Sequence, residues 1–520
     1  MTAEPVRRAE IVAALSLATD LAIGQPLEFA LKSCVLGMRI GEALDLSPEE
    51  LRQIYFQALL RYIGCNADTY LLSALVGDEM AFRREVARAD LADDLEMLTL
   101  LARAARRVTE GEGLVAMVVA VLRAMAMGRA VSTPVLSGHC EVASRLAERL
   151  SLGSAIARNL GQLYERWDGK GLPSGLRGEA ISPAVRVVSL AQDAIVLREA
   201  YGWEDACRQI GSRRGKAYDP RLADLILARG DDLFRGLDMA ATMEAVLGLE
   251  PEPHAWIAAE ELDQACTVIA DFVDMRTPFT IGHSRAVSEL AAAAARHCGL
   301  PPHDSTLLRR AGLVHDLGEL SIPTSVWMSP GPMRHRDGEQ IRLHPYFTER
   351  ILTGPAPLAE AAALAGRHHE RLDGSGYFRG ARGQALSLPA SILAAAEAYQ
   401  TKIEARPHRA SLSPGAAAQA LRGEAREGRL DGRAVEAVLA AAGRPGRATP
   451  RARTDGLTAR EIEVLRHLCQ GKTLRQLAGD LGISPKTADN HVQSLYSKVG
   501  VSTRAGAVLF AVEQGLTAGA

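Results

Sequence analysis

The sequence is poor in aromatic residues and lacks the features of a membrane-spanning or secreted protein. Only 4% of its 520 residues are Phe, Trp or Tyr, while Ala and Leu are abundant and β-branched runs are rare. This composition favours helices over sheets. No uncharged apolar run is long enough to cross a bilayer, and the N-terminus lacks the apolar core of a signal peptide. We therefore expect a cytoplasmic protein without a membrane partner.

The sequence also lacks a cysteine motif and a large net charge. The seven cysteines are scattered and none forms a C-x-x-C pair, so we expect buried, reduced thiols. The formal net charge is -2, so any basic surface that meets a polyanion must be local. A chain of 520 residues is too long for one hydrophobic core, and about three domains are expected.

Histidine is concentrated in one stretch, where its pattern is typical of a hydrolytic metal centre. An adjacent His-Asp pair at 315–316 is followed by His344 and by an adjacent His-His pair at 368–369. Neighbouring His and Asp side chains offer a metal one nitrogen and one oxygen ligand, and later histidines can complete the site. Burying such a set among apolar helices without a metal or partners would be costly.

The stretch 283–397 resembles the HD-GYP branch of the HD phosphohydrolase superfamily. The matching residues are His283, His315-Asp316-Leu317-Gly318, His344-Pro345, His368-His369-Glu370-Arg371, Asp373-Gly374-Ser375-Gly376-Tyr377 and Ala396-Glu397-Ala398-Tyr399. The resemblance implies an all-helical fold and two or three divalent metal ions, commonly Fe or Mn. It also implies hydrolysis of a phosphorylated nucleotide such as cyclic di-GMP.

The resemblance further implies which residues do the chemistry. Asp316 would bridge two metals as a catalytic residue together with His315, because two metals roughly 3.5–4 Å apart can hold a phosphodiester and generate a hydroxide. The implied metal ligands are His283 and His315 on one ion, His344, His368 and His369 on another, and in addition Asp316, Glu397 and Asp274. The implied substrate contacts are Arg371, Asp373, Gly374, Gly376 and Tyr377.

Three positions depart from the family pattern. The Lys that usually follows His-Asp-x-Gly is Glu319, which replaces a cation with an anion and inverts the local field. The signature Gly-Tyr-Pro ends in Phe378, and the usual terminal Asp is Glu397. These departures leave open a changed substrate, slow turnover, or a catalytically inactive metal-binding scaffold.

The first half of the chain contains a weaker copy of the same region. The pattern E-R-x-D-G-x-G occurs at 165–171 and again at 370–376. On this register His139 corresponds to His344 and Gly64 to Gly318, but Arg61 and Tyr62 replace the His-Asp pair. A copy without that pair cannot hold a hydrolytic metal cluster.

We therefore predict an all-α protein with two HD-type helical domains in tandem. The first, residues 1–250, would be degenerate and would serve packing, dimerisation or ligand sensing. The second, residues 251–442, would be the metal-dependent phosphohydrolase. Residues 443–455 are rich in Pro, Gly and Arg without periodicity, which predicts a linker.

The C-terminal residues 456–520 predict a DNA-binding domain. Thr458 and Glu461 have the spacing of a capping box, Gly482 marks a tight turn, and Ser484-Pro485 can start the next helix. This is the layout of a helix-turn-helix. The stretch resembles the LuxR-type (GerE-like) module through Leu457-Thr458-Ala459-Arg460-Glu461, Gly471-Lys472-Thr473, Leu481-Gly482-Ile483-Ser484, His491-Val492 and Lys498-Val499-Gly500-Val501.

The second resemblance implies that helix 485–498 enters the major groove of promoter or operator DNA. Base contacts would come from Asp489, Asn490 and Gln493, and phosphate contacts from Lys486, Thr487, His491 and Lys498. We expect a homodimer, because one recognition helix buries too little surface for operator specificity. The first hypothesis is a transcriptional regulator whose metal domain senses or cleaves a phosphorylated nucleotide. The alternatives are a phosphodiesterase with an accessory DNA-binding module, or the inactive scaffold.

Overall fold

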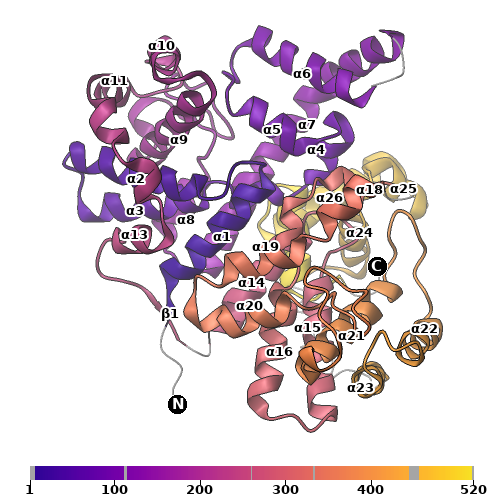
Figure 1. Ribbon diagram of the computed structural model, residues 1–520. Coiled ribbons are helices and arrows are strands. Elements are labelled where there is room, and N and C mark those ends of the chain that lie inside the picture. Colours follow the sequence, from indigo (N-terminus) through magenta and orange to yellow (C-terminus); the bar gives the residue numbers. More distant parts are fainter. Residues whose placement is uncertain (1–5, 110–113, 259–260, 332–333, 444–455, 518–520) are drawn as a thin grey trace. The chain divides into compact units, whose positions relative to one another are not determined.

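The computed structural model describes residues 6–109, 114–258, 261–331, 334–443 and 456–517, and these are mostly helical (Figure 1). The all-α prediction is met except for two short strands, β1 (Val6–Arg7) and β2 (Trp256–Ile257), which pair in a small sheet. Among the described helices, none is long and apolar enough to cross a membrane. The predicted linker lies outside the described residues apart from Gly443.

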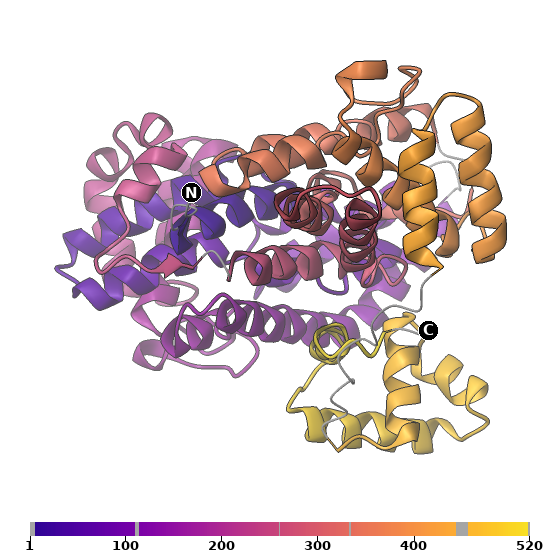
Figure 2. The same cartoon turned by 90° about the horizontal axis from the view of Figure 1, so that it is seen from below.

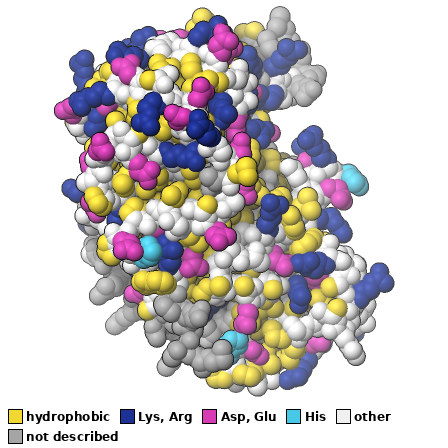
Figure 3. All heavy atoms as spheres, turned by 60° about the vertical axis from the view of Figure 1, so that its left-hand side comes forward, with side chains coloured by type: hydrophobic (Ala, Val, Ile, Leu, Met, Phe, Trp, Pro, Cys, Tyr) yellow, Lys and Arg dark blue, Asp and Glu magenta, His cyan; other side chains and the backbone are white. Residues whose placement is uncertain are grey.

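Two compact units make up the chain, and each is described by itself. One is Arg7–Ile257, and the other is Ala258–Ala520 with Met1–Val6. The sequence had placed the end of the first domain at residue 250, ahead of β2. On the face seen in Figure 3, Lys and Arg side chains alternate with Asp and Glu, as a net charge of -2 would suggest.

The N-terminal unit is built almost entirely of helices. Its elements are α1 (Arg8–Ala22), α2 (Phe29–Ala43), α3 (Pro48–Leu60), η1 (Ile63–Asn66), α4 (Thr69–Val76), α5 (Glu79–Val86), α6 (Asp94–Val108), α7 (Leu114–Arg149), α8 (Ser154–Leu160), η2 (Gly178–Ala180), α9 (Pro183–Tyr201), α10 (Trp203–Arg213), α11 (Pro220–Phe234), α12 (Leu237–Ala240) and α13 (Met243–Gly248). The helices α2, α3 and α9 pack together around Phe29 and Phe56, which are fully buried.

Helix α7 of this unit lies directly against the short turn η1. A Cβ on Gly64 would come within 1.8 Å of the carbonyl oxygen of His139. Beside this contact, Arg61 Nη1 donates a hydrogen bond to Ser189 Oγ at 2.7 Å, and its charge interacts with the carboxylate of Asp193. The N-terminal unit therefore carries a guanidinium beside η1, at the position that the sequence register predicts to correspond to the His-Asp pair.

The C-terminal unit contains the histidine-rich region and the last four helices. Its elements are α14 (Leu262–Asp274), α15 (His283–His297), α16 (Pro302–Val314), η3 (Leu317–Ser321), α17 (Thr324–Trp327), α18 (His335–Ile341), α19 (His344–Leu352), η4 (Ala356–Leu358), α20 (Ala359–Ala365), η5 (Gly383–Ala385), α21 (Leu388–Ile403), α22 (Pro414–Arg426), α23 (Gly432–Ala442), α24 (Ala459–Cys469), α25 (Leu474–Asp480), α26 (Pro485–Val499) and α27 (Arg504–Glu513).

Close packing of α15 on α16 fixes where the His-Asp pair begins. The face of α15 that meets α16 is rich in alanine, and Gly312 of α16 lies so near that a Cβ there would approach Ser288 Cα to 2.6 Å. Small residues on both sides allow this approach. Helix α16 then ends at Val314, so that His315 follows at its C-cap.

The turn η3 is held against α19 by hydrogen bonds and by the close approach that Gly318, which has no side chain, allows. The backbone NH of Gly318 donates to Thr348 Oγ1 at 2.9 Å, and that hydroxyl donates to the carbonyl of His315 at 2.8 Å. A Cβ on Gly318 would lie 1.9 Å from the carbonyl oxygen of His344. This contact brings the start of α19 to the His-Asp pair.

The last four helices, α24–α27, are yellow in Figure 2. They pack around an apolar cluster of their own. Helix α24 begins with the expected capping box, in which Thr458 Oγ1 accepts from the NH of Glu461 and the carboxylate accepts from the NH of Thr458. Ser484 caps α26, and Gly500 ends it in the left-handed conformation. The local sequence signals for these helices are therefore confirmed.

Replacing Gly318 with Ala should destabilise the C-terminal unit. The new methyl group would meet backbone atoms that cannot move without separating η3 from α19, at a cost of about 1–3 kcal/mol. We expect Gly318→Ala to lower the temperature of the corresponding thermal unfolding transition. Gly415→Ala is the matched control, because a Cβ there meets nothing within 4 Å. Equal melting of both variants would contradict this account.

Candidate metal centre

Predicted ligands from five separate segments come together inside the C-terminal unit. His283 opens α15, His315 and Asp316 follow α16, His344 opens α19, His368 and His369 follow α20, and Glu397 lies within α21. All are buried except His369, which is half-buried. Their ligand atoms form overlapping groups within 4.8 Å, including His283 with His315 and Glu397, and His344 with His368 and His369.

Backbone carbonyl groups orient three of the imidazoles. The Nδ1 atoms of His315, His344 and His368 lie 2.9, 2.7 and 2.6 Å from the carbonyl oxygens of Gly312, Ile341 and Ala365, each three residues earlier. A carbonyl oxygen can only accept, so each Nδ1 carries a proton and each Nε2 atom is directed into the centre. This arrangement is the usual outer support of metal-ligating histidines.

Within the described residues, three of the inward-facing nitrogens are poorly partnered. The Nε2 atoms of His344 and His368 face each other at 2.9 Å, and two lone pairs at that distance repel unless a cation or proton lies between them. The buried Nε2 of His315 makes no hydrogen bond, although Asp316 Oδ2 lies 3.1 Å away. Both features fit a set of ligands for divalent metal ions.

Asp316 lies between the two histidine sets. Its Oδ2 atom is 3.1 Å from Nε2 of His315 and 3.5 Å from Nε2 of His283, while its Oδ1 atom is 3.6 Å from Nε2 of His344 and 3.4 Å from Nε2 of His368. One carboxylate thus offers one oxygen to each set. This geometry suits a carboxylate bridge between two metals.

His283 is oriented by a carboxylate that the sequence analysis did not identify. Its Nε2 lies 2.9 Å from Glu397 Oε2, and its Nδ1 lies 2.8 Å from Oε2 of Glu404. Glu404 is itself held by Gln400 and Arg406. A carboxylate on the outer nitrogen raises the basicity of a ligating imidazole. Glu404 was missed because no motif marks it: it follows the end of α21.

The two histidine sets differ in protonation before any metal binds. Burial lowers the pKa of His344 to about 3, and the neighbouring His368 adds to this effect. For His315, burial also acts downward, but Asp316 and Glu397 outweigh it and raise the pKa to about 10. His344 therefore presents a neutral lone pair, whereas metal binding beside His315 must displace a proton.

Two acidic residues near the centre differ in their surroundings. Asp274 has both carboxylate oxygens on Ser284, one accepting from its NH at 2.9 Å and one from its hydroxyl at 2.7 Å, and it belongs to none of the candidate ligand groups among the described residues. Its role as a metal ligand stays a prediction. Glu319, in contrast, groups with Asp316 and His344. Burial raises its pKa well above the ordinary value, and the charge of Asp316 raises it further.

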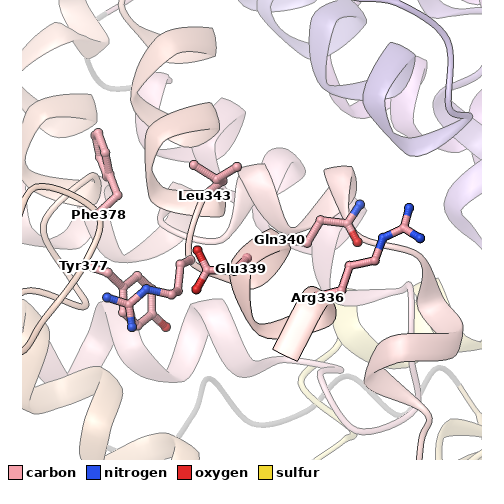
Figure 4. A pocket seen from close by; sticks show the side chains of 7 residues that line it. Arg336, Glu339, Gln340, Leu343, Tyr377 and Phe378 are labelled. Atoms are coloured by element: carbon pink, nitrogen blue, oxygen red, sulfur yellow. The ribbon is translucent and has the colours of Figure 1, made fainter. Parts of the chain in front are cut away.

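A cavity of about 390 Å³ lies next to the centre and shares Tyr377 with it (Figure 4). The Tyr377 ring stacks on His369 at 4.6 Å between centroids, and the guanidinium of Arg342 lies 5.1 Å above the same ring. The other residues lining the cavity are Arg336, Glu339, Gln340, Leu343 and Phe378. Arg336 and Arg342 were not predicted, because nothing in the local sequence around α18 marks them as site residues.

The other predicted substrate contacts build the loop that carries Tyr377. Oδ1 of exposed Asp373 accepts from the NH and the hydroxyl of Ser375, and Gly374 has φ of 81°. A Cβ on Gly376 would lie 2.4 Å from the NH nitrogen of Arg371, whose guanidinium donates to the carbonyl of Glu370 at 2.9 Å. Their contact with substrate stays a prediction.

The helix predicted to read DNA is α26. Lys486, Thr487, Asn490 and Gln493 are exposed on it, whereas Asp489 and His491 are partly covered. Lys498 Nζ donates to Glu461 at 2.7 Å, so this lysine ties α26 to α24 in addition to its predicted phosphate contact. The DNA contacts themselves stay predictions.

Comparisons with known proteins agree with both resemblances. Residues 130–222 and 267–434 match the family described as "HD domain", and residues 455–511 match "Bacterial regulatory proteins, luxR family". The Vibrio cholerae serotype O1 protein "3'3'-cGAMP-specific phosphodiesterase 3" is 29% identical over 409 residues, which are 78% of this chain and 88% of that protein.

A solved structure and a regulatory protein extend these similarities. A crystal structure of a cyclic GMP-AMP specific phosphodiesterase of Vibrio cholerae matches with a TM-score of 0.59 at 26% identity, covering 84% of this chain and 98% of that chain. The Mycobacterium tuberculosis "Probable transcriptional regulatory protein NarL" is 47% identical over 60 residues, 12% of this chain and 28% of that protein.

Removal of divalent metal should destabilise the C-terminal unit. We expect chelation by EDTA to lower its unfolding temperature and Mn²⁺ or Fe²⁺ to restore it, with about 2.7 kcal/mol gained at a hundredfold excess over Kd. Asp316→Asn should lose this metal response, because the shared charge is gone. His303→Gln, at an imidazole 72% exposed, should keep it. A wild-type protein that melts identically with and without metal would refute the assignment.

Proposed function

We propose that this chain, which belongs to the HD-domain family, is a metal-dependent phosphodiesterase of 3'3'-linked cyclic dinucleotides that also carries a DNA-binding module. The observation that carries the proposal is the Asp316 carboxylate, with one oxygen toward each of two inward-facing histidine sets. The specificity stated in the name of the Vibrio relative supports this substrate class. Cyclic GMP-AMP thereby joins cyclic di-GMP as a candidate substrate.

The residues of the centre suit hydrolysis of a phosphodiester. Bound Fe or Mn ions would supply Lewis acidity toward the phosphate oxygens and a hydroxide at neutral pH. His283, His315 and Glu397 would hold one ion and His344, His368 and His369 the other, with Asp316 shared. The hydrogen bonds to backbone carbonyls keep the imidazoles in place, so that no ligand has to reorient during the reaction.

The adjacent cavity suits the base and sugar-phosphate parts of such a substrate. Its volume of about 390 Å³ is in the usual range for a ligand site. Tyr377 and Phe378 contribute aromatic rings to its wall, and Arg336 and Arg342 provide positive charge for a phosphate.

We further propose that the N-terminal unit is a degenerate copy of the same domain. The carbonyl of His139 covers Gly64 as that of His344 covers Gly318. Glu165 accepts from two backbone NH groups, of residues 174 and 176, just as Glu370 accepts from those of residues 379 and 381. Arg61 and Tyr62 in place of the His-Asp pair leave this copy without a ligand set, so its role is structural or sensory.

The C-terminal module supports a second function, DNA binding by a homodimer. The exposed side chains of α26 include amide groups at Asn490 and Gln493, which suit adenine edges, and a cation at Lys486. We propose that nucleotide turnover in the metal domain regulates this binding, so that the chain acts on transcription.

The hydrolysis proposal is tested with the metal-loaded full chain and cyclic GMP-AMP or cyclic di-GMP, with the linear product followed by chromatography. Asp316→Asn should reduce kcat at least a hundredfold, because neither ion then has its bridging carboxylate. His303→Gln should match the wild type. Wild-type activity no higher than that of Asp316→Asn on either nucleotide would refute the proposal.

Removal of a cavity arginine should affect binding more than chemistry. Arg342→Ala should raise KM about tenfold, the effect of about 1.4 kcal/mol, with little change in kcat. Arg422→Ala is the control, because that guanidinium pairs with Glu436 on the surface of α22. An unchanged KM in Arg342→Ala would show that the cavity is not part of the substrate-binding site.

DNA binding is tested by fluorescence anisotropy with promoter fragments selected from the source genome. Asn490→Ala should weaken specific binding by about 1–3 kcal/mol while leaving binding to random DNA unchanged. Lys486→Ala should weaken binding to specific and to random DNA alike. It should also reduce the slope of the logarithm of the binding constant against the logarithm of the salt concentration by about one. No retention of any fragment at low salt would contradict the assignment of α26.

A further inference from the structure

Glu319 lies at the metal centre although the family pattern has a lysine at its position. It sits in η3, three residues after Asp316, and its side chain is half-buried. One of its carboxylate oxygens lies within 4.8 Å of both a carboxylate oxygen of Asp316 and a ring nitrogen of His344. Within the described part of the chain, this carboxylate has no hydrogen bond or ion pair.

The backbone holds Glu319 in this place. Its NH donates to the carbonyl of Asp316 at 2.9 Å, and its own carbonyl accepts from the NH of Ile322 at 3.0 Å and from Arg276 Nη1 at 3.2 Å. The next residue upstream, Gly318, is pressed against α19. The direction of the Glu319 side chain therefore follows from the same packing that builds the centre.

Two ionised carboxylates that face each other inside a protein repel, and either a proton or a cation between them relieves the repulsion. Asp316 already serves the two histidine sets, and Arg406, whose charge acts on Glu319, donates its hydrogen bonds to Glu404 and to the carbonyl of Phe279. Among the described residues, no Lys or Arg side chain forms an ion pair with Glu319. A divalent ion held between Asp316 and Glu319 removes the repulsion.

We propose that Glu319 is a metal ligand of this chain, binding the ion held by His344 through its carboxylate. The inference rests on the metal centre of the proposed function. His344 has one available lone pair, on Nε2, since its Nδ1 is bonded to the carbonyl of Ile341, so it serves a single ion. That ion therefore takes Glu319 in addition to Asp316, His368 and His369.

A second carboxylate changes what this ion can be and how it is held. It lowers the net charge of the site and adds a hard oxygen donor, which favours Mn²⁺ or Fe²⁺ in higher coordination over tetrahedral Zn²⁺. The exchange of the family's lysine for Glu319 then replaces a residue that faces the substrate with one that binds the metal. The substrate loses a cation at this position, and the metal gains an anionic ligand.

The test is a Mn²⁺ titration of the metal-free full chain, with free ion measured by EPR and bound ion by elemental analysis. The wild type should bind two ions. Glu319→Gln, which keeps the shape and removes the charge, should bind one of them at least tenfold more weakly and alter the EPR spectrum of bound Mn²⁺. Glu360→Gln is the matched control, at a carboxylate 72% exposed on α20, and should change nothing.

Retention of both ions by Glu319→Gln, with wild-type affinity and spectrum, would overturn the inference. If Glu319→Gln does not fold by circular dichroism, Glu319→Asp replaces it, and the shorter arm should weaken the same ion. A wild type that binds two ions but hydrolyses no cyclic dinucleotide refutes the proposed reaction and leaves Glu319 as a ligand. Full hydrolysis together with an unaffected Glu319→Gln titration refutes only the ligand.

Discussion

The close approach of the inward-directed nitrogens of His344 and His368, at 2.9 Å, is the constraint on which the centre of the C-terminal unit depends. The helix ends at His315, His344 and His368 fix each ring through its own backbone, so the rings cannot turn away to relieve the conflict. The fold thus keeps an electrostatically unfavourable arrangement ready, and cations are what resolve it. The surrounding helices are best understood as the support that prevents this arrangement from relaxing.

That support relies on backbone contact rather than on large side chains. Gly318 allows the turn after α16 to touch the first residue of α19, and Gly312 allows α16 to touch α15. Both contacts require a residue without a Cβ, because the nearest atoms belong to the opposing backbone. Such contacts leave the helices little freedom to shift, so they help to hold the ligands at their mutual distances.

Sequence reasoning succeeded where a signal is local and failed where only folding brings residues together. The capping box at Thr458 and the adjacent His-Asp pair are short patterns whose chemistry can be stated directly. Arg342 and Glu404 acquire their positions from the packing of α18 and α21, and no sequence motif identifies either residue. Asp274 was placed by analogy, and both of its carboxylate oxygens are engaged by Ser284. The two short strands pair residues about 250 positions apart, beyond any local pattern.

Arg61 gives the N-terminal unit a charge that no chelator can extract. Its guanidinium is covalently part of the chain and interacts with Asp193, so this charge does not depend on a bound ion. On the proposed assignment, the C-terminal unit would instead obtain its compensating charge from bound divalent metal. Loss of metal would then change the interior of one unit and leave that of the other as it is.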